Sequence, residues 1–259
     1  NKRSITLDLK KEEAVEIFFK LAKKADVIVE NYRPDVKFRL GIDYEKIKKV
    51  NSKIVYASIS GFGQDGPLSG RPGFDQIAQG MGGLMSITGK PGDGPMRVGI
   101  PIADLCAGNF AAQGVLLALL GVENTGKGQW IQTSLLQAQI YMLDFQAARW
   151  LMDRDVALQA GNDHPKTIPT GVFETSDGHI NIAVAGNHIW ERLKKVLNDD
   201  RFNEKIYDEP NSRSKNRITL NALINENTRK DTSDNWIALL NENGVPCGEI
   251  NSIDKVFNN

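Results

Sequence analysis

The sequence predicts an α/β protein: a large domain built on a Rossmann-like, doubly wound parallel sheet, followed by a smaller α+β domain. In the first part of the chain, short apolar runs alternate with helical patterns, which is typical of a parallel sheet covered by helices. The composition changes at residues 157–171, and two strand-like runs then flank a tight turn. We therefore expect a large domain at residues 1–135, a helical linker at 136–160 and a small domain at 161–259.

The large domain begins with three predicted strands. Residues 4–9, 26–32 and 53–60 are rich in β-branched and other apolar side chains, and helical patterns at 11–25 and 44–50 separate them. Successive strands joined through helices run parallel, so their carboxyl ends should lie at one edge of the sheet.

The remaining elements follow a long glycine- and proline-rich stretch, residues 61–101, in which we expect one helix at 74–87. The segment 103–121 predicts a helix buried on most sides, and 128–135 an edge strand. A single long helix at 135–153 should join the domains. The small domain should contain two strands within 171–185 and helices at 188–198, 217–228 and 234–244.

The composition argues against several classes of protein. Lys plus Arg and Asp plus Glu both number 32, so no basic excess points to a nucleic-acid partner. The two cysteines are far apart and the three histidines lack ligand spacing, which argues against a disulfide framework and a metal site. The N-terminal segment is polar, and the apolar stretch 110–122 is expected to be too short to span a membrane. We expect a cytoplasmic protein.

A glycine pattern suggests a dinucleotide site at first sight. Gly61, Gly63 and Gly66 form G-x-G-x-x-G directly after a predicted strand. A true fingerprint opens a helix at its third glycine, because the helix N-terminus holds the pyrophosphate. Here Pro67 and Pro72 follow Gly66 and no helix is predicted there, so the pattern favours a glycine-rich loop.

Cations and an aromatic ring gather at the predicted strand ends. Lys10 follows the first strand, Asn31, Tyr32 and Arg33 follow the second, and Arg39 lies shortly beyond. A ring, an amide and cations at one sheet edge suit an adenine nucleotide with its phosphates. The alternative interpretation is a simple strand-exit turn, since Asn and Pro are common in turns.

Asp104 stands at the start of the apolar helix, among small residues. One interpretation is an N-cap, because Asp commonly accepts a hydrogen bond from the first turn. The other is a nucleophile, a carboxylate able to attack an acyl group and form an anhydride. The residue types alone leave both open.

The chain resembles the class III CoA-transferases, which include formyl-CoA transferase and carnitine CoA-transferase. The matching segments include "KRSITLDLK", "ADVIVENYRPDVKFRLGIDYEKIKKV", "RPGFDQIAQGMGGLMSITG", "VGIPIADLCAG" and "GNDHP", in family order. The resemblance implies that Asp104 is the nucleophile. It implies CoA contacts at Leu9, Lys10, Asn31, Tyr32, Arg33, Arg39, Phe74 and Asp75.

The resemblance also implies the partners of the protein. The substrates would be an acyl-CoA and a carboxylic acid, with no tightly bound cofactor, no metal, no nucleic acid and no membrane partner. Family members form interlocked homodimers. They carry an earlier strand and a later segment beyond the residues matched here, so the sheet is expected to be incomplete at its N-terminal side.

Two alternatives remain at this stage. The first is an acyl-CoA racemase or epimerase with a different base, because related alpha-methylacyl-CoA racemases carry His where this chain has Phe74, and Phe cannot move the proton that the reaction requires. A non-catalytic acyl-CoA-binding protein would have the same CoA contacts without turnover.

Overall fold

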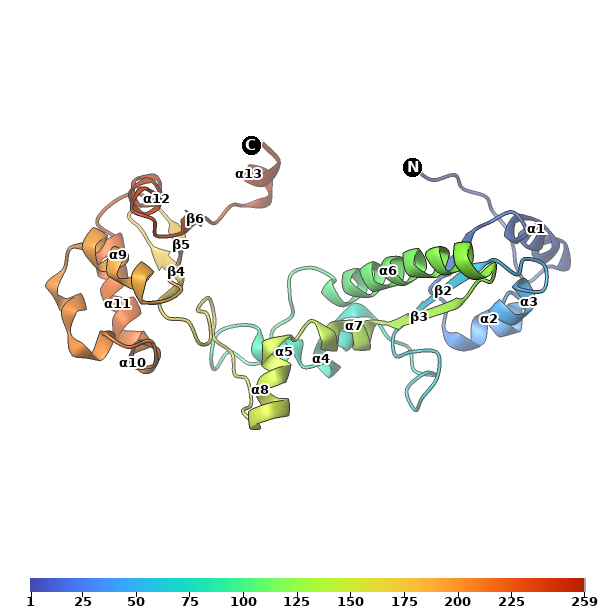
Figure 1. Ribbon diagram of the computed structural model, residues 1–259, viewed down its shortest axis with the longest axis horizontal. Coiled ribbons are helices and arrows are strands. Elements are labelled where there is room, and N and C mark those ends of the chain that lie inside the picture. Colours follow the sequence, from blue (N-terminus) through green and yellow to red (C-terminus); the bar gives the residue numbers. More distant parts are fainter. Residues whose placement is uncertain (259) are drawn as a thin grey trace. The chain divides into compact units, whose positions relative to one another are not determined.

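The computed structural model of the protein describes residues 1–258, which divide into two compact units (Figure 1). Unit 1 contains residues 1–88 and 94–158, and unit 2 contains residues 89–93 and the chain from residue 159 onward. Of the residues 136–160 expected as a linker, 136–158 cluster with unit 1. Each unit has its own sheet and its own core.

Unit 1 is a parallel α/β unit. Its elements, in chain order, are α1 (Glu12–Ala22), β1 (Val27–Glu30), α2 (Pro34–Leu40), α3 (Tyr44–Ile47), β2 (Val55–Ser60), α4 (Asp75–Met81), α5 (Leu84–Ile87), α6 (Ile102–Thr125), β3 (Trp130–Ser134), α7 (Leu135–Tyr141) and α8 (Phe145–Asp153).

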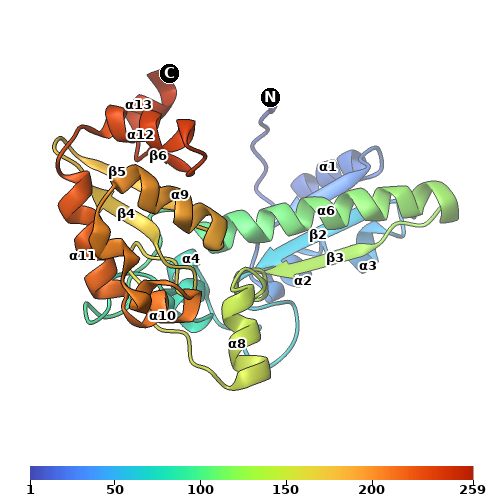
Figure 2. The same ribbon diagram turned by 60° about the vertical axis from the view of Figure 1, so that its left-hand side comes forward.

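The three strands of unit 1 form one sheet in the order β1-β2-β3, and both pairs are parallel. Side chains alternate across a strand, so β2 has two differently packed faces. Tyr56 joins a core made with α1 and the α2–α3 region, whereas Ile59 packs against the core of α4, α6 and α7. Helices therefore cover both faces, which confirms the predicted parallel sheet with flanking helices (Figure 2).

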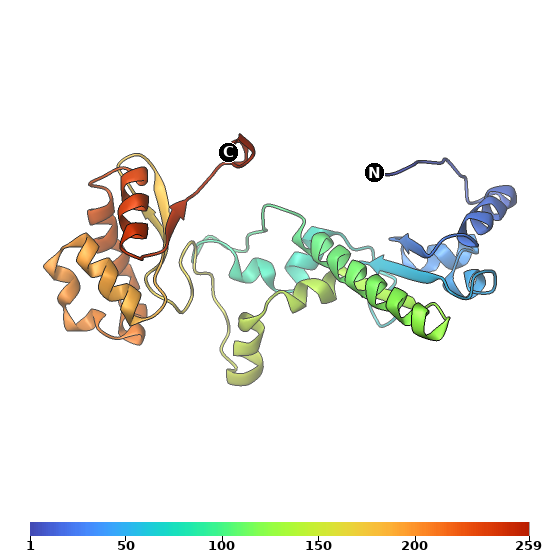
Figure 3. The ribbon, with the colours of Figure 1, turned by 45° about the horizontal axis from the view of Figure 1, so that its top comes forward.

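Helix α6 packs along β2 and β3 (Figure 3). The expectation that it is buried on most sides is wrong, because Leu116, Leu117 and Leu120 are 63%, 69% and 58% exposed. The expectation that this apolar segment is too short to span a membrane is also wrong, because residues 110–122 lie inside a helix of 24 residues. By length and composition, α6 is the one helix among the described residues that could cross a membrane.

Three further predictions for unit 1 need correction. Residues 4–9 form no strand, because a strand needs a hydrogen-bonded neighbour and neither β1 nor β3 pairs with them. The predicted helix at 135–153 is interrupted between α7 and α8, where Asp144 has a φ of 48°. The helix expected at 74–87 likewise divides into α4 and α5 at a glycine pair.

Unit 2 is an α+β unit. Its elements are β4 (Thr170–Glu174), β5 (His179–Ala183), α9 (Asn187–Leu197), two 3-10 turns (Asp200–Asn203 and Lys205–Tyr207), α10 (Pro210–Lys215), α11 (Arg217–Thr228), α12 (Ser233–Glu242), β6 (Cys247–Glu249) and α13 (Ile253–Asn258). The sheet has the order β4-β5-β6 and both pairs are antiparallel, which confirms the predicted hairpin. One face packs on α9, α11 and α12 around the fully buried Trp190.

Candidate functional site

Asp104 lies in the first turn of α6 but does not cap the helix. The N-cap residue is Pro101, and within the described chain no hydrogen bond or ion pair involves the Asp104 side chain. The residue is exposed, and the buried Ala103 and Ala107 flank it on the same helix. The N-cap interpretation is therefore wrong, and the carboxylate is open to solvent.

Asp75 performs the capping instead, from the first position of α4. Its Oδ1 accepts a hydrogen bond from the backbone N–H of Ala103 at 2.9 Å, and its Oδ2 accepts one from Gln79 Nε2 at 2.7 Å. An Arg97 nitrogen lies 3.7 Å from the same Oδ2. Asp75 is buried, so these contacts hold the start of α6 against α4.

The electrostatics at the start of α6 are unusual for an exposed carboxylate. A position in the first helical turn favours the ionised form. The pKa of Asp104 is nevertheless raised, first by partial desolvation from neighbouring atoms and second by the negative charge of Asp75. Carboxylates whose pKa is shifted by desolvation and a specific charge partner are frequent at functional sites.

Two of the predicted cations, Lys10 and Arg39, line a cavity of unit 1. Leu9, Lys10 and Arg39 line one cavity of about 870 Å³ between the N-terminal segment, α1 and the end of α2. Arg33 lies at the N-cap position of α2, directly after β1. The structure therefore brings Leu9, Lys10 and Arg39 together around one cavity, although no strand precedes Lys10.

Asp35 links two of the predicted phosphate ligands. Its Oδ1 lies 3.3 Å from Arg33 Nε, and its Oδ2 lies 3.8 Å from an Arg39 guanidinium nitrogen. All three side chains are more than half exposed, so the pairs are weak and the guanidinium groups remain open to another anion.

The other predicted contact residues differ in accessibility. Asn31 and Tyr32 are exposed at the end of β1, and Phe74 is 76% exposed at the N-cap of α4. Asp75 is the exception, since both of its oxygens are occupied within the fold. Among the described residues, none of these side chains forms a hydrogen bond or an ion pair with Asp104.

The glycine pattern after β2 forms a loop. Gly63 and Gly66 have φ values of 101° and 83°, and no helix begins before α4. A dinucleotide fingerprint would require a helix at the third glycine. The absence of one over residues 61–74 confirms the loop interpretation.

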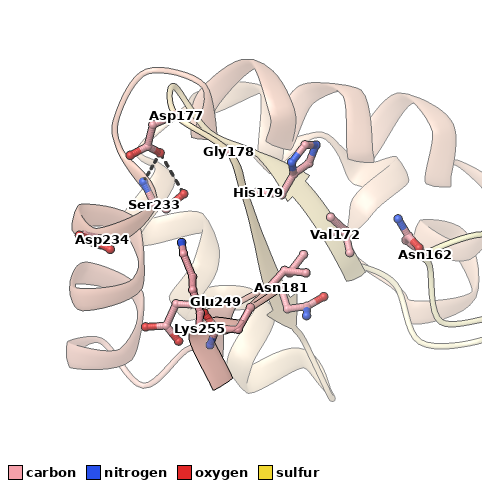
Figure 4. Close-up of a pocket in the computed structure, with 12 residues that line it drawn as sticks. Asn162, Val172, Asp177, Gly178, His179, Asn181, Ser233, Asp234, Glu249 and Lys255 are labelled. Atoms are coloured by element: carbon pink, nitrogen blue, oxygen red, sulfur yellow. Dashed lines mark hydrogen bonds between the residues drawn. The ribbon is translucent and has the colours of Figure 1, made fainter. Parts of the chain in front are cut away.

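A larger cavity, of about 910 Å³, lies in unit 2 and contains none of the predicted site residues (Figure 4). Its lining is polar and includes His179 and Asn181 from β5. Asp177 Oδ1 there accepts hydrogen bonds from the N–H and the hydroxyl of Ser233, and the N–H bond is the first cause that lowers the pKa of Asp177. Size alone does not make this cavity the functional site. No group of three or more potential metal ligands lies together in the described chain.

Sequence reasoning missed three residues that the structure adds to the site: Asp35, Gln79 and Arg97. The spacing of Asp75 and Gln79, four positions apart, could have indicated a contact on one helix face. Arg97 lies in an irregular segment, and nothing in the sequence signals its approach to Asp75.

Known proteins resemble this chain over its whole length. A family model described as CoA-transferase family III matches residues 1–259. The succinate–glutarate CoA-transferase of Agrobacterium fabrum is 35% identical over 257 residues, which is 99% of this chain and 64% of that protein. The acetyl-CoA:oxalate CoA-transferase of Acetobacter aceti is 35% identical over 99% of this chain and 67% of that protein.

A solved structure gives the same result for the fold. A CAIB/BAIF family protein from Brucella suis superposes with a TM-score of 0.88 at 34% identity, over 99% of this chain and 68% of that one. The chain spans 64% of the Agrobacterium relative and 59% of a succinyl-CoA:glutarate CoA-transferase from Mus musculus, which is 36% identical.

Proposed function

The chain belongs to CoA-transferase family III, and on that basis we propose that it moves CoA from an acyl-CoA donor to a carboxylic acid acceptor. The observation that carries the proposal is the state of Asp104. Its carboxylate is exposed, has no capping role and has a raised pKa, while Asp75 holds the start of the helix.

The proposed reaction begins when an Asp104 carboxylate oxygen attacks the thioester carbonyl carbon of the donor. The carbon–sulfur bond breaks, giving an aspartyl–acyl anhydride and a CoA thiolate. The thiolate then attacks the aspartyl carbonyl, which releases the donor acid and leaves an aspartyl-CoA thioester. The acceptor carboxylate attacks the carbonyl carbon of this thioester, its carbon–sulfur bond breaks, and a second anhydride and the CoA thiolate are formed. The thiolate then attacks the acceptor carbonyl, giving acceptor-CoA and free Asp104.

We place the nucleotide part of CoA at the sheet edge of unit 1. The cavity lined by Lys10 and Arg39 supports this, with Arg33 and the exposed Tyr32 close by in the sequence. Arg presents a planar set of donors that matches phosphate oxygens, and an aromatic ring can stack on adenine. In this proposal, Asp75 holds the start of α6 through the N–H of Ala103. A direct contact between Asp75 and CoA stays a prediction.

The names of the relatives suggest the acid substrates. Succinate, glutarate and oxalate appear in them, and all three are dicarboxylic acids. We propose a dicarboxylate acceptor, with succinyl-CoA as the first donor to test.

The decisive experiment replaces Asp104 by Asn or Ala in the full-length protein. Loss of the nucleophile should lower CoA transfer from succinyl-CoA to glutarate or oxalate roughly 10⁴-fold or more. The melting temperature should stay close to that of the wild type, because Asp104 makes no contact that stabilises α6. Transfer that persists in both variants would exclude Asp104 as the nucleophile.

The same assay separates the alternatives. During turnover, mass spectrometry of the intact protein should detect a CoA adduct. After digestion, the adduct should be found on the peptide that contains Asp104. Alpha-hydrogen exchange of an acyl-CoA in heavy water without added acid would instead favour a racemase or epimerase. CoA binding without turnover across a panel of dicarboxylic and hydroxy acids would favour a non-catalytic binding protein.

The CoA site has its own test. Replacing Arg39 by Ala should lower the affinity for CoA about tenfold or more, because a charge-assisted hydrogen bond contributes roughly 1.5–3 kcal/mol. Arg229 of unit 2, which is also exposed, serves as the matched control. Unchanged CoA affinity in the Arg39 variant, measured by calorimetry, would remove this residue from the site.

We further propose an interlocked homodimer located in the cytoplasm. Leu116, Leu117 and Leu120 on α6, together with Leu151 and Met152 on α8, expose large apolar surfaces of the kind that interfaces cover. An interlocked dimer should bury well over about 2,000 Å² and should not dissociate on dilution before it unfolds. Sedimentation of the full-length protein tests this, and a folded monomer would contradict it. Both cysteines are free, which suits a reducing compartment, and fractionation of the source cells tests the location.

A further inference from the structure

Lys37 is fully buried in α2, although lysine is among the residue types that proteins bury least. Its Nζ lies 3.4 Å from Glu30 Oε1 and donates a hydrogen bond to Gln64 Oε1. The ammonium group also lies 5.6 Å from the ring centroid of Trp130, so part of its charge meets an aromatic face.

These contacts join three separate segments. Glu30 is the last residue of β1, and its Oε2 accepts a hydrogen bond from the backbone N–H of Tyr32 at 2.8 Å. Gln64 belongs to the loop that follows β2, and Lys37 itself belongs to α2. Lys37 therefore connects the end of β1 to the loop after β2, and through Glu30 it reaches the backbone of Tyr32.

The connected segments carry or adjoin several of the proposed CoA contacts. Tyr32 and Arg33 follow β1, and Arg39 stands on the exposed side of the helix whose buried side carries Lys37. The loop after β2 continues to Phe74 and Asp75, and Asp75 holds the N–H of Ala103 beside Asp104. Lys37 touches none of the proposed CoA contacts with its side chain in the described structure, so any effect on binding must pass through its neighbours.

The arrangement is a poor device for stability. A buried ion pair rarely stabilises a protein more than apolar side chains of similar volume would. Gln64 Nε2 in this cluster is also buried without a hydrogen-bond partner, which costs free energy, and Glu30 Oε1 has the ion pair with Lys37 but no hydrogen bond. What the charged side chain adds over an apolar one is a directed connection between two separate segments, the end of β1 and the loop after β2.

We propose that Lys37 is a positioning residue for CoA, which fixes the end of β1 and the loop after β2 in the arrangement that receives the nucleotide. This inference rests on the proposed function. Without the connection, the two loops must be ordered when CoA binds, and the affinity for CoA falls by the corresponding free energy. The chemistry at Asp104 does not involve Lys37, so the turnover rate at saturation should hardly change.

The test uses two variants of the full-length protein. Lys37→Met removes the connection but leaves the Glu30 carboxylate buried without its cation, so it lowers the melting temperature as well. The double variant Glu30→Gln/Lys37→Met removes both charges and keeps an acceptor for the Tyr32 N–H, so most of the stability returns. Lys49→Met, at an exposed lysine of the same unit, is the matched control.

The expected result is a CoA dissociation constant about tenfold higher in both variants, measured by calorimetry, with unchanged binding in the Lys49 control. The KM for the acyl-CoA should rise in parallel while kcat stays within about twofold. A double variant whose affinity returns together with its stability would overturn the proposal and leave Lys37 a purely structural residue. Wild-type protein that binds no CoA would overturn the proposed function and this inference together, whereas variants that bind like the wild type would overturn the inference alone.

Discussion

Replacing Asp75 by Asn should change both the stability and the pH dependence of the protein. The side chain keeps its shape, so the introduced amide can still accept the N–H of Ala103 through its oxygen. The NH₂ group of that amide then faces Gln79 Nε2, which is also a donor, where the carboxylate had accepted at 2.7 Å. Either orientation of the new amide leaves one buried donor without an acceptor.

The expected loss of stability follows from these contacts. A hydrogen bond to a charged group contributes about 1.5–3 kcal/mol. The Arg97 pair adds little, because Arg97 is partly exposed and its nitrogen lies 3.7 Å away. We expect a loss of about 2 kcal/mol, which for a unit of this size lowers the melting temperature by roughly 4–8 °C.

The pH dependence of activity should move as well. The pKa of Asp104 is raised first by desolvation and second by the charge of Asp75, and the substitution removes the second cause. The pKa of Asp104 then falls toward its ordinary value. Because the proposed attack needs the ionised carboxylate, the acid limb of the pH profile of kcat should shift to lower pH.

The stability has a linked pH dependence. Since the folded pKa of Asp104 is raised, the folded protein holds this proton more tightly than the unfolded chain does. This contribution favours the folded state at acid pH, and it is lost as the pH rises through the folded pKa. In the Asp75→Asn variant this part of the pH dependence should shrink.

Thermal unfolding and a pH–rate profile of the same preparations provide the assay. Asp65→Asn, at an exposed position in the loop after β2, is a matched control for stability. A melting temperature equal to that of the control, together with an unmoved acid limb, would refute the reasoning that Asp75 both holds α6 and raises the pKa of Asp104.

Three other substitutions test separate features. Asp35→Asn should strengthen CoA binding about two- to fivefold at low salt, because it removes an exposed carboxylate that competes with CoA for Arg33 and Arg39. Weaker binding in calorimetry would mean that Asp35 instead holds the two arginines in place. Arg213→Met should destabilise unit 2 by about 3 kcal/mol in urea unfolding, because the buried guanidinium donates hydrogen bonds to three backbone carbonyls and to Asn187. A loss of stability below about 1 kcal/mol would show that those acceptors find other partners. Gly61→Ala should cost about 1–3 kcal/mol, because its Cβ would lie 2.8 Å from the Cα of Gly73 across the base of the loop; an unchanged melting temperature would contradict this close approach.

The sequence determined most of the local structure. The apolar runs at 26–32 and 53–60 contain β1 and β2, and the predicted helix at 217–228 has the same bounds as α11. The residue types left Asp104 open between an N-cap and a nucleophile, and the family resemblance of the neighbouring residues implied the nucleophile. The glycine pattern, in turn, lacked the helix that a dinucleotide site requires.

The tertiary structure alone decided which polar side chains serve the site. Asp75 and Ala103 are 28 positions apart, so the sequence could not show that Asp75 caps α6 and leaves Asp104 open. Lys37 looks like an ordinary surface lysine until Glu30 and Gln64 enclose it. Residues 4–9 have the alternation of a strand but no neighbour to pair with. Periodicity and turn chemistry act over a few residues, whereas capping, charge pairing and strand pairing depend on segments that only folding brings into contact.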